Sequence, residues 1–224
     1  MNPLTPAFVN FLQELSANNN RDWFNHEKKR FKADVEAPFH AFVAEMIARM
    51  DAIRSGLDLI TPKDCIFRIY RDTRFSKDKT PYKTHMAALI GPGGRKEMAK
   101  PSMYIQLSGE DARLYSGVYK PDKSQLYAIR QAIVRNPLGF QKAYSDKDFQ
   151  AAFGKIQGDK NKRLPAEFRE AAEQEPLLFN KGFYYYHIWS TEQMLKQDFH
   201  DELMRTFAAA DKVNDFLIDA LAEK

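Results

Sequence analysis

The chain has 224 residues and a single cysteine, Cys65, which excludes an internal disulfide framework. A lone cysteine fits a reducing compartment, so we expect a cytoplasmic protein. No stretch approaches the ~18 apolar residues of a membrane-spanning helix, and the N-terminus lacks the basic flank and apolar core of a signal peptide. The sequence therefore predicts a protein without a membrane segment.

Signatures of metal, cofactor and nucleophile chemistry are also missing. The histidines never fall at the spacing of zinc ligands, and no Gly-x-Ser-x-Gly elbow occurs. The glycine-rich stretch 91–96 lacks the spacing of a phosphate-binding loop and predicts a turn between two strands. Cys65 alternates with Phe67 and Ile69, which indicates a buried side chain and not a nucleophile. We therefore expect no metal and no cofactor.

The composition, with 44% hydrophobic and 29% charged residues, is that of an ordinary globular protein. At this length we expect a single domain over residues 1–224. It should consist of a helical part at 1–60, an antiparallel sheet at 61–120, and helices with one aromatic strand at 121–224.

Helical signals are clearest near the two ends of the chain. Thr5-Pro6 is a cap and first-turn pair, and large apolar residues then recur on one helical face. Asn20 can cap a second helix, and Pro38 can open a third. Asp122-x-x-Gln125 resembles a capping box, and the polar composition of 137–176 predicts short helices joined by loops.

Apolar and polar residues alternate in the middle of the chain, as they do in strands with two different faces. The expected strands cover residues 65–70, 82–90, 102–108, 112–119 and 182–189. These elements predict an α+β fold, with a central, mainly antiparallel sheet of about five strands and N- and C-terminal helices packed on it. Met103, Ile105 and Leu107 should face the core. Unless helices cover the other face, it would present side chains that stack and donate hydrogen bonds, namely Arg68, Tyr70, Lys83, His85, Tyr104, Gln106, Arg113, Tyr115 and Tyr119.

The charge of the chain is concentrated in one stretch. The whole sequence has 34 basic and 30 acidic residues, a formal charge of +4. Residues 63–83 alone contain seven cations and three carboxylates, and the remainder balances at 27 of each sign. A local excess of this kind indicates an electropositive site for an anionic ligand.

Several side chains of this stretch are candidates for holding a phosphate or carboxylate. Guanidinium and ammonium groups grip such anions through charged hydrogen bonds, and the candidate contacts are Arg68, Arg71, Arg74 and Lys79. Asp72 would orient an arginine, Tyr82 would supply a hydroxyl, and His85 follows on the next strand. The alternative is a network of arginine and aspartate that pins a long loop to the sheet, with Phe75 as its apolar anchor.

The same residues resemble a known family, the bacterial domain of unknown function 2461 family, whose signature is R-x-x-R-D-x-R-F-x-x-[D/N]-K-x-x-Y. Each fixed position is present, at Arg68, Arg71, Asp72, Arg74, Phe75, Asp78, Lys79 and Tyr82. The segments Asn18-Asn-Asn-Arg-Asp-Trp-Phe24 and Gly117-Val-Tyr-Lys-Pro121 are similar to the family as well. The resemblance implies no particular reaction, because the family has no assigned activity and no established catalytic residues.

Three functions compete at this point. The first is binding of an anionic small molecule, and the second is a metal-independent enzyme in which His85 or Tyr82 transfers a proton while arginines stabilise negative charge. The third is nucleic-acid binding, suggested by aromatic residues among basic ones. Residues 181–188 begin like the RNP1 strand of RNA-recognition domains, but Tyr184 replaces the small residue, and the alternating side with Phe183 and Tyr185 is expected to pack in the core.

Overall fold

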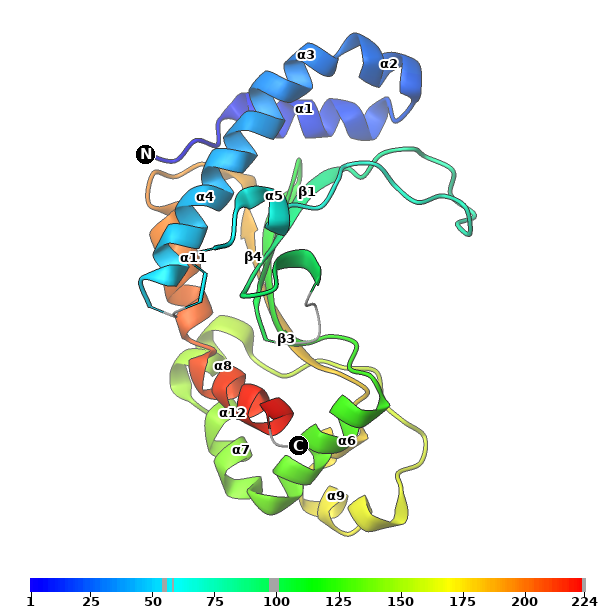
Figure 1. Cartoon of the computed structure of the whole chain (residues 1–224), viewed down its shortest axis with the longest axis vertical. Helices are drawn as coiled ribbons and strands as arrows, with labels where there is room; N and C mark the ends of the chain where they lie inside the picture. Colours follow the sequence, from blue (N-terminus) through cyan, green and yellow to red (C-terminus); the bar gives the residue numbers. More distant parts are fainter. Residues whose placement is uncertain (54–55, 58, 97–100, 223–224) are drawn as a thin grey trace. The chain divides into compact units, whose positions relative to one another are not determined.

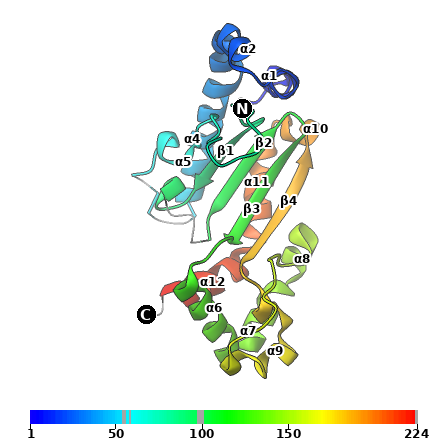
Figure 2. The same cartoon turned by 90° about the vertical axis from the view of Figure 1, so that its right-hand side faces the viewer.

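The computed structural model describes residues 1–53, 56–57, 59–96 and 101–222. It confirms the α+β class, with a four-stranded antiparallel sheet among these residues in the order β1-β2-β3-β4. The strands are β1 (His85–Ile90), β2 (Met103–Ser108), β3 (Asp111–Val118) and β4 (Phe183–Ser190). Figure 2 shows them side by side, with α11 passing behind. All four fall within stretches whose alternation predicted a strand, to within a residue at their ends.

The chain divides into two compact units. Unit 1 comprises residues 1–96, 104–114 and 188–204, and unit 2 comprises 97–103, 115–187 and 205–224. Each unit is described below by itself. The single domain expected from the chain length stays a prediction.

Unit 1 contains the N-terminal helices (Figure 1). These are α1 (Pro6–Ala17), α2 (Arg21–His26), α3 (Lys28–Arg30), the π-helix η1 (Phe31–Glu36), α4 (Ala37–Asp51) and α5 (Pro62–Cys65). Shorter elements are η2 (Gly94–Lys96) and α10 (Thr191–Met194), and α11 (Phe199–Ala208) begins here. As predicted, the Asn20 side chain accepts a hydrogen bond from the Trp23 N–H at the start of α2. No helix in the described ranges has both the length and the apolar character needed to cross a bilayer.

The second and third helices are not separated as the sequence suggested. Pro38 does lie in the first turn of α4, but α4 continues directly from the π-helical turn η1. Proline has no N–H and cannot donate to the preceding turn, and a local change from α to π hydrogen bonding accommodates such an interruption without ending the helix. The result is one nearly continuous helical wall from α3 to α4.

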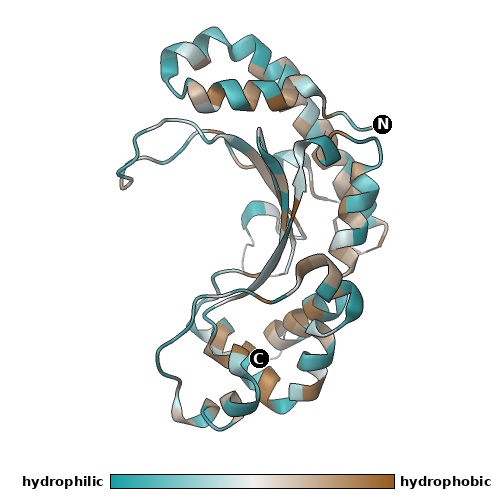
Figure 3. Ribbon diagram, turned by 180° about the vertical axis from the view of Figure 1, so that it is seen from behind, coloured by the Kyte–Doolittle hydropathy of each residue, from teal (hydrophilic) through white to brown (hydrophobic). Residues whose placement is uncertain are grey.

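The core of unit 1 is apolar and rich in aromatic residues. Phe42 of α4 stacks on Phe199 at 5.9 Å, and Phe199 meets the edge of Trp189 at 5.5 Å. These helical residues cover one face of the strands. In Figure 3 the N-terminal helices carry brown, apolar segments among teal, polar ones. Met103, Ile105 and Leu107 are fully buried, as their alternation predicted.

The expectation of about five strands is wrong, because residues 65–70 do not form a regular strand. Pro62 and a capping box between Thr61 and Asp64 start the helical turn α5 instead. Beyond it, only isolated bridges join Ile66 to Ala88 and Tyr70 to Tyr82. Between these two bridges the chain advances by four residues from Ile66 to Tyr70, but by six residues from Tyr82 to Ala88. A regular antiparallel ladder needs equal numbers, so the pairing cannot be continuous. Alternation alone did not reveal this change of register.

Unit 2 contains short helices packed around one aromatic core. Its helices are α6 (Lys123–Arg135), α7 (Pro137–Tyr144), α8 (Lys147–Phe153), α9 (Ala171–Gln174) and α12 (Asp211–Ala222), with 3₁₀ turns η3 (Ala166–Phe168) and η4 (Pro176–Phe179). The predicted capping box joins Asp122 and Gln125 at the start of α6. Tyr185 of β4 packs edge-on against Phe149 at 4.9 Å, and its hydroxyl donates to the buried Asn214 side chain.

Two glycines of unit 2 provide a stability test. Gly117 and Gly154 both have positive φ, of 89° and 69°. A Cβ on Gly117 would lie 2.2 Å from the Phe183 carbonyl oxygen, whereas a Cβ on Gly154 would meet no atom within 4 Å. Gly154→Ala should therefore lower the unfolding free energy by ~1–3 kcal/mol through backbone strain alone, because φ 69° with ψ −50° lies outside the regions that alanine adopts readily. Gly117→Ala should cost at least ~1 kcal/mol more, because β3 and β4 must separate. Urea unfolding checks the order, and equal losses would contradict it.

Candidate functional site

The loop 71–80 carries most of the signature residues, and its charges pair within the loop. The Arg74 guanidinium donates to both carboxylate oxygens of Asp72, with Nε–Oδ1 at 3.0 Å and Nη2–Oδ2 at 2.7 Å. The Arg74 backbone N–H also donates to Asp72, at 3.2 Å. These bonds hold the pKa of Asp72 below its usual value. Asp72 therefore orients an arginine, as expected, and neutralises it.

Arg71 is satisfied in the same way by the other aspartate of the loop. Its guanidinium donates to the Asp78 carboxylate and to the Thr80 side chain and carbonyl. The hydrogen bond from the Thr80 N–H and, to a smaller extent, the one from the Arg71 guanidinium lower the pKa of Asp78 to about 2. The Lys79 ammonium donates to the Thr73 carbonyl at 2.8 Å. These contacts fix the conformation of the loop.

Phe75 does not anchor the loop, because its side chain is 94% exposed. The neighbouring Arg74 guanidinium lies 5.8 Å from the ring centroid. In Figure 1 the loop runs out from the start of β1, away from the strands of unit 1. An apolar anchor would have to lie against the sheet, so this part of the structural alternative is wrong.

Tyr82 connects the signature to the N-terminal helices. Its ring is buried and stacks on Phe24 of α2, with centroids 4.0 Å apart and planes 20° apart. The Asn19 side chain accepts from the Tyr82 N–H at 3.1 Å and donates to the Tyr82 carbonyl at 2.9 Å. Burial raises the pKa of the Tyr82 hydroxyl. Tyr82 thus holds the chain segment after the loop against α2.

His85 lies in a separate, polar pocket of about 580 Å³ between α1 and the ends of β1, β2 and β3. Gln13, Gln106 and Arg113 line it with His85. Burial, with the charges of Lys83 and Arg113 nearby, lowers the pKa of His85 to about 4. The imidazole is therefore neutral at pH 7, and a proton-transfer role there would have to start from the neutral base.

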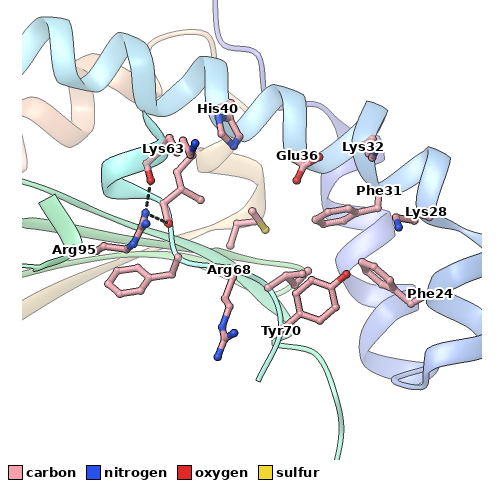
Figure 4. A pocket seen from close by; sticks show the side chains of 14 residues that line it. Phe24, Lys28, Phe31, Lys32, Glu36, His40, Lys63, Arg68, Tyr70 and Arg95 are labelled. Atoms are coloured by element: carbon pink, nitrogen blue, oxygen red, sulfur yellow. Dashed lines mark hydrogen bonds between the residues drawn. The ribbon is translucent and has the colours of Figure 1, made fainter. Parts of the chain in front are cut away.

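A second pocket of unit 1, of about 500 Å³, collects cations that no carboxylate neutralises; we call it the basic pocket. One wall is the helical run from α3 to α4, which contributes Lys28, Lys32, Glu36 and His40 at intervals of four residues. Lys63 faces this wall (Figure 4). Lys28, Lys32 and Lys63 form no ion pair within the described ranges, and Glu36 is the one carboxylate of the lining.

Aromatic and aliphatic side chains form the floor of the basic pocket. Phe24, Phe31 and Tyr70 lie together at one end in Figure 4, with Phe24 and Phe31 in ring contact at 5.1 Å. The rest of the apolar lining is Ile66, Phe67, Ile69 and Met86. An apolar floor under a cationic rim suits a ligand with an apolar body and an anionic group.

Two arginines border the basic pocket differently. Arg95 donates to the carbonyls of Lys63 and Ile66, at 3.0 Å for Ile66, which joins η2 to the segment after α5. Arg68 lines the pocket, but its exposed guanidinium points away from Lys28 and Lys32 in Figure 4. Arg95 therefore stabilises the side of the pocket that contains Lys63 and Ile66. Arg68 can reach only the outer edge of a bound ligand.

The predicted site residues do not meet at one point. Arg71, Asp72, Arg74 and Lys79 lie in the loop, Tyr82 packs on Phe24, His85 lines the polar pocket, and Arg68 lines the basic pocket. Ligand binding by this set stays a prediction. Sequence reasoning missed Lys28 and Lys32. Their spacing of four residues, extended by Glu36 and His40, was the available signal.

Metal and thiol chemistry find no support in the described ranges. No group of three or more His, Cys, Asp or Glu side chains gathers there as a metal site. Cys65 is buried, and burial raises the pKa of its thiol to about 11. The thiol is therefore protonated at neutral pH and a poor nucleophile.

The low pKa of His85 predicts how stability varies with pH. An unfolded histidine binds a proton near pH 6.5, whereas folded His85 resists it until about pH 4. The stability that this difference provides is complete above pH 6.5 and falls as the pH drops from 6.5 to 4. His85→Gln should make this loss smaller. Urea unfolding at pH 7.5 and 5 measures it, and the buried His200, whose pKa is also lowered, should maintain part of the slope. An unchanged loss would contradict the assignment.

The comparison with protein families agrees with the resemblance of the signature. The model of a family described as conserved hypothetical protein (DUF2461) matches residues 7–216 of the 224. No curated protein matches the chain. The family match covers the N-terminal helices, the sheet and the C-terminal helices alike, and this chain therefore belongs to the DUF2461 family of conserved hypothetical proteins.

Proposed function

We propose that the protein binds a small molecule bearing a phosphate or carboxylate, and that the basic pocket holds it. The observation that carries the proposal is the group formed by Lys28, Lys32 and Lys63, three cations of one pocket that have no carboxylate partner in the described ranges. The anionic group would contact Lys28 and Lys32, and Lys63 would attract a second charged or polar group at the other end of the pocket, beside His40 (Figure 4). Arg68 would contact only the outer edge of the ligand.

The contrast with the loop 71–80 supports this choice of site. Asp72 and Asp78 already occupy the guanidinium donors of Arg74 and Arg71. A ligand would have to displace these carboxylates, which are held by backbone N–H groups as well. The lysines of the basic pocket are exposed and are held by no such partner, so an anion gains their full attraction.

The floor of the basic pocket indicates what else the ligand contains. Phe24, Phe31 and Tyr70 offer aromatic surface next to the lysines. A pocket volume of about 500 Å³ lies in the ordinary range for small-molecule sites, ~300–1,000 Å³. An aromatic or otherwise apolar body would bury surface there while its charged group stays at the rim. Aryl phosphates, aromatic carboxylates and nucleotides meet this description.

Residues of both signature segments lie at or next to this pocket, which supports the choice of this site. Phe24 ends the Asn18–Phe24 segment, Tyr82 ends the loop signature, and the two rings stack at 4.0 Å. Arg68 begins the signature and borders the pocket. In this proposal the paired loop arginines are positioning residues, since they fix the chain between Arg68 and Tyr82.

The pocket lysines should determine affinity. Replacing Lys28 and Lys32 together with glutamine removes two charges while keeping the stems. Since a hydrogen bond to a charged group is worth about 1.5 kcal/mol, the affinity for phenyl phosphate should fall about tenfold for each lysine that contacts it. Isothermal titration at low salt measures this effect.

Lys29→Gln is the matched control for these substitutions. Lys29 is exposed on the same short helix α3 but does not line the basic pocket. Its replacement should leave the affinity unchanged. Equal losses in the two variants would mean that only overall charge matters, and no binding of phenyl phosphate, a nucleoside monophosphate or an aromatic carboxylate to the wild type would contradict the proposal.

Removing the single carboxylate of the lining should act in the opposite direction. Glu36→Gln leaves the three lysines unopposed, and a partly exposed charge interaction is worth ~0.5–1 kcal/mol. The affinity for phenyl phosphate should therefore rise about twofold to fivefold, with the gain shrinking as salt is added. A loss of affinity would indicate that the anion does not bind near Glu36, and it would contradict the assignment of the ligand to this pocket.

A further inference from the structure

Unit 2 carries a cluster of four tyrosines on one face of β3 and β4. Tyr115 and Tyr186 lie across the two strands with ring centroids 5.4 Å apart, and Tyr119 and Tyr184 meet edge to face at 5.1 Å. We call this cluster the tyrosine face. Tyr184 and Tyr186 are two residues apart on β4 and so share one face, and Tyr119 directly follows Val118, the last residue of β3.

The tyrosine face is separate from the core of unit 2. On β4 the alternate side chains Phe183 and Tyr185 are fully buried on the opposite side of the sheet. By contrast, Tyr119 is 53% and Tyr186 is 38% exposed. Large aromatic surface left in water by two neighbouring strands is unusual for packing alone and marks a recognition surface.

Basic residues lie beside the tyrosine face. Residues 155–163 pass the start of β4 and the residues before it, where bridges join Gln157 to Tyr184 of β4 and Lys160 to Asn180. This segment has four exposed cations, Lys155, Lys160, Lys162 and Arg163, against one carboxylate, Asp159. None of the four forms an ion pair within the described ranges. Just after the end of β3, the Lys120 ammonium lies 5.1 Å from the Tyr119 ring centroid.

We propose that the tyrosine face and residues 155–163 together bind single-stranded nucleic acid. Bases would stack on exposed rings such as Tyr119 and Tyr186, and the phosphates would follow the lysines beside β4. Stacking rings next to a row of cations are the combination with which proteins hold single strands without reading their sequence. The unpaired cations favour this polyanion over a neutral sugar chain. A sugar chain can also stack on aromatic rings, but it has no charge that the cations would attract.

The geometry differs from the RNP1 resemblance in the sequence. The RNP1 pattern would use Phe183 and Tyr185 to stack on bases, but both side chains are buried in this protein. The other set of β4 side chains, Tyr184 and Tyr186, reaches the surface. The proposal therefore depends on the outward register of β4, in an antiparallel sheet that presents aromatic residues as RNA-recognition domains do.

Fluorescence anisotropy with labelled oligonucleotides of about 12 nucleotides tests the proposal. Oligo(dT) and oligo(U) serve as DNA and RNA probes, and the full chain is titrated at 50 and 200 mM salt. Both probes should bind, with affinity falling steeply as salt rises. Tyr119→Leu and Tyr186→Leu should each weaken binding about fivefold or more, because each removes a stacking ring. Tyr186→Phe should bind like the wild type.

Tyr127→Leu is the matched control. Tyr127 is 40% exposed in unit 2, but it lies on α6, where its hydroxyl donates to Glu167. Its replacement should leave binding unchanged. Lys160→Gln with Lys162→Gln should lower the steepness of the salt dependence.

Several outcomes would overturn the proposal. These are no binding of either probe at 50 mM salt, affinity independent of salt, equal loss in Tyr127→Leu and Tyr119→Leu, or tighter binding to duplex than to single strands. Binding of an uncharged glycan in place of the oligonucleotides would also overturn it. Circular dichroism of each variant, compared with the wild type, shows whether a loss comes from unfolding.

Discussion

The stack of Tyr82 on Phe24 is the contact on which the architecture of unit 1 depends. The side-chain amide of Asn19 grips both backbone groups of Tyr82, so the ring cannot turn away from α2. Phe24 is at the same time part of the floor of the basic pocket. Asn19 and Tyr82, which are 63 residues apart in the sequence, are thereby joined next to the pocket residue Phe24. This explains physically why the asparagine run and the arginine signature occur in one chain.

Charge in this protein has two different uses. In the loop 71–80 each arginine meets an aspartate a few residues away, so the opposite charges serve conformation and leave little field outside. In the basic pocket and along residues 155–163, cations stand without acidic partners in the described ranges, and the field extends into solvent. A net charge of +4 hides this division, because it counts both kinds of cation alike.

Much of the fold could be predicted from the sequence because its signals are local. The caps at Asn20 and Asp122 and the alternation of β2 act over three to six residues, and the structure has them where they were expected. The fifth strand failed because its pairing with β1 changes register, which depends on two distant segments at once. The lysines of the basic pocket were missed for a similar reason. Arginines close in sequence are paired locally, whereas Lys28 and Lys63 line one pocket only because the helical wall packs on α5.

The π-helical turn η1 influences which side of the helical run faces the basic pocket. Residues four apart in a regular α-helix advance by about 40° around the axis, so over three such steps they would drift by roughly 120°. The wider turn at Phe31–Glu36 offsets part of that rotation, and Lys28, Lys32, Glu36 and His40 all line one cavity despite it. The local hydrogen-bond pattern of the helix therefore helps to determine which side chains line the pocket. A homologue that lacks one residue of this turn would direct Lys28 and the residues after the turn to different sides of the helix, even if it conserved both lysines.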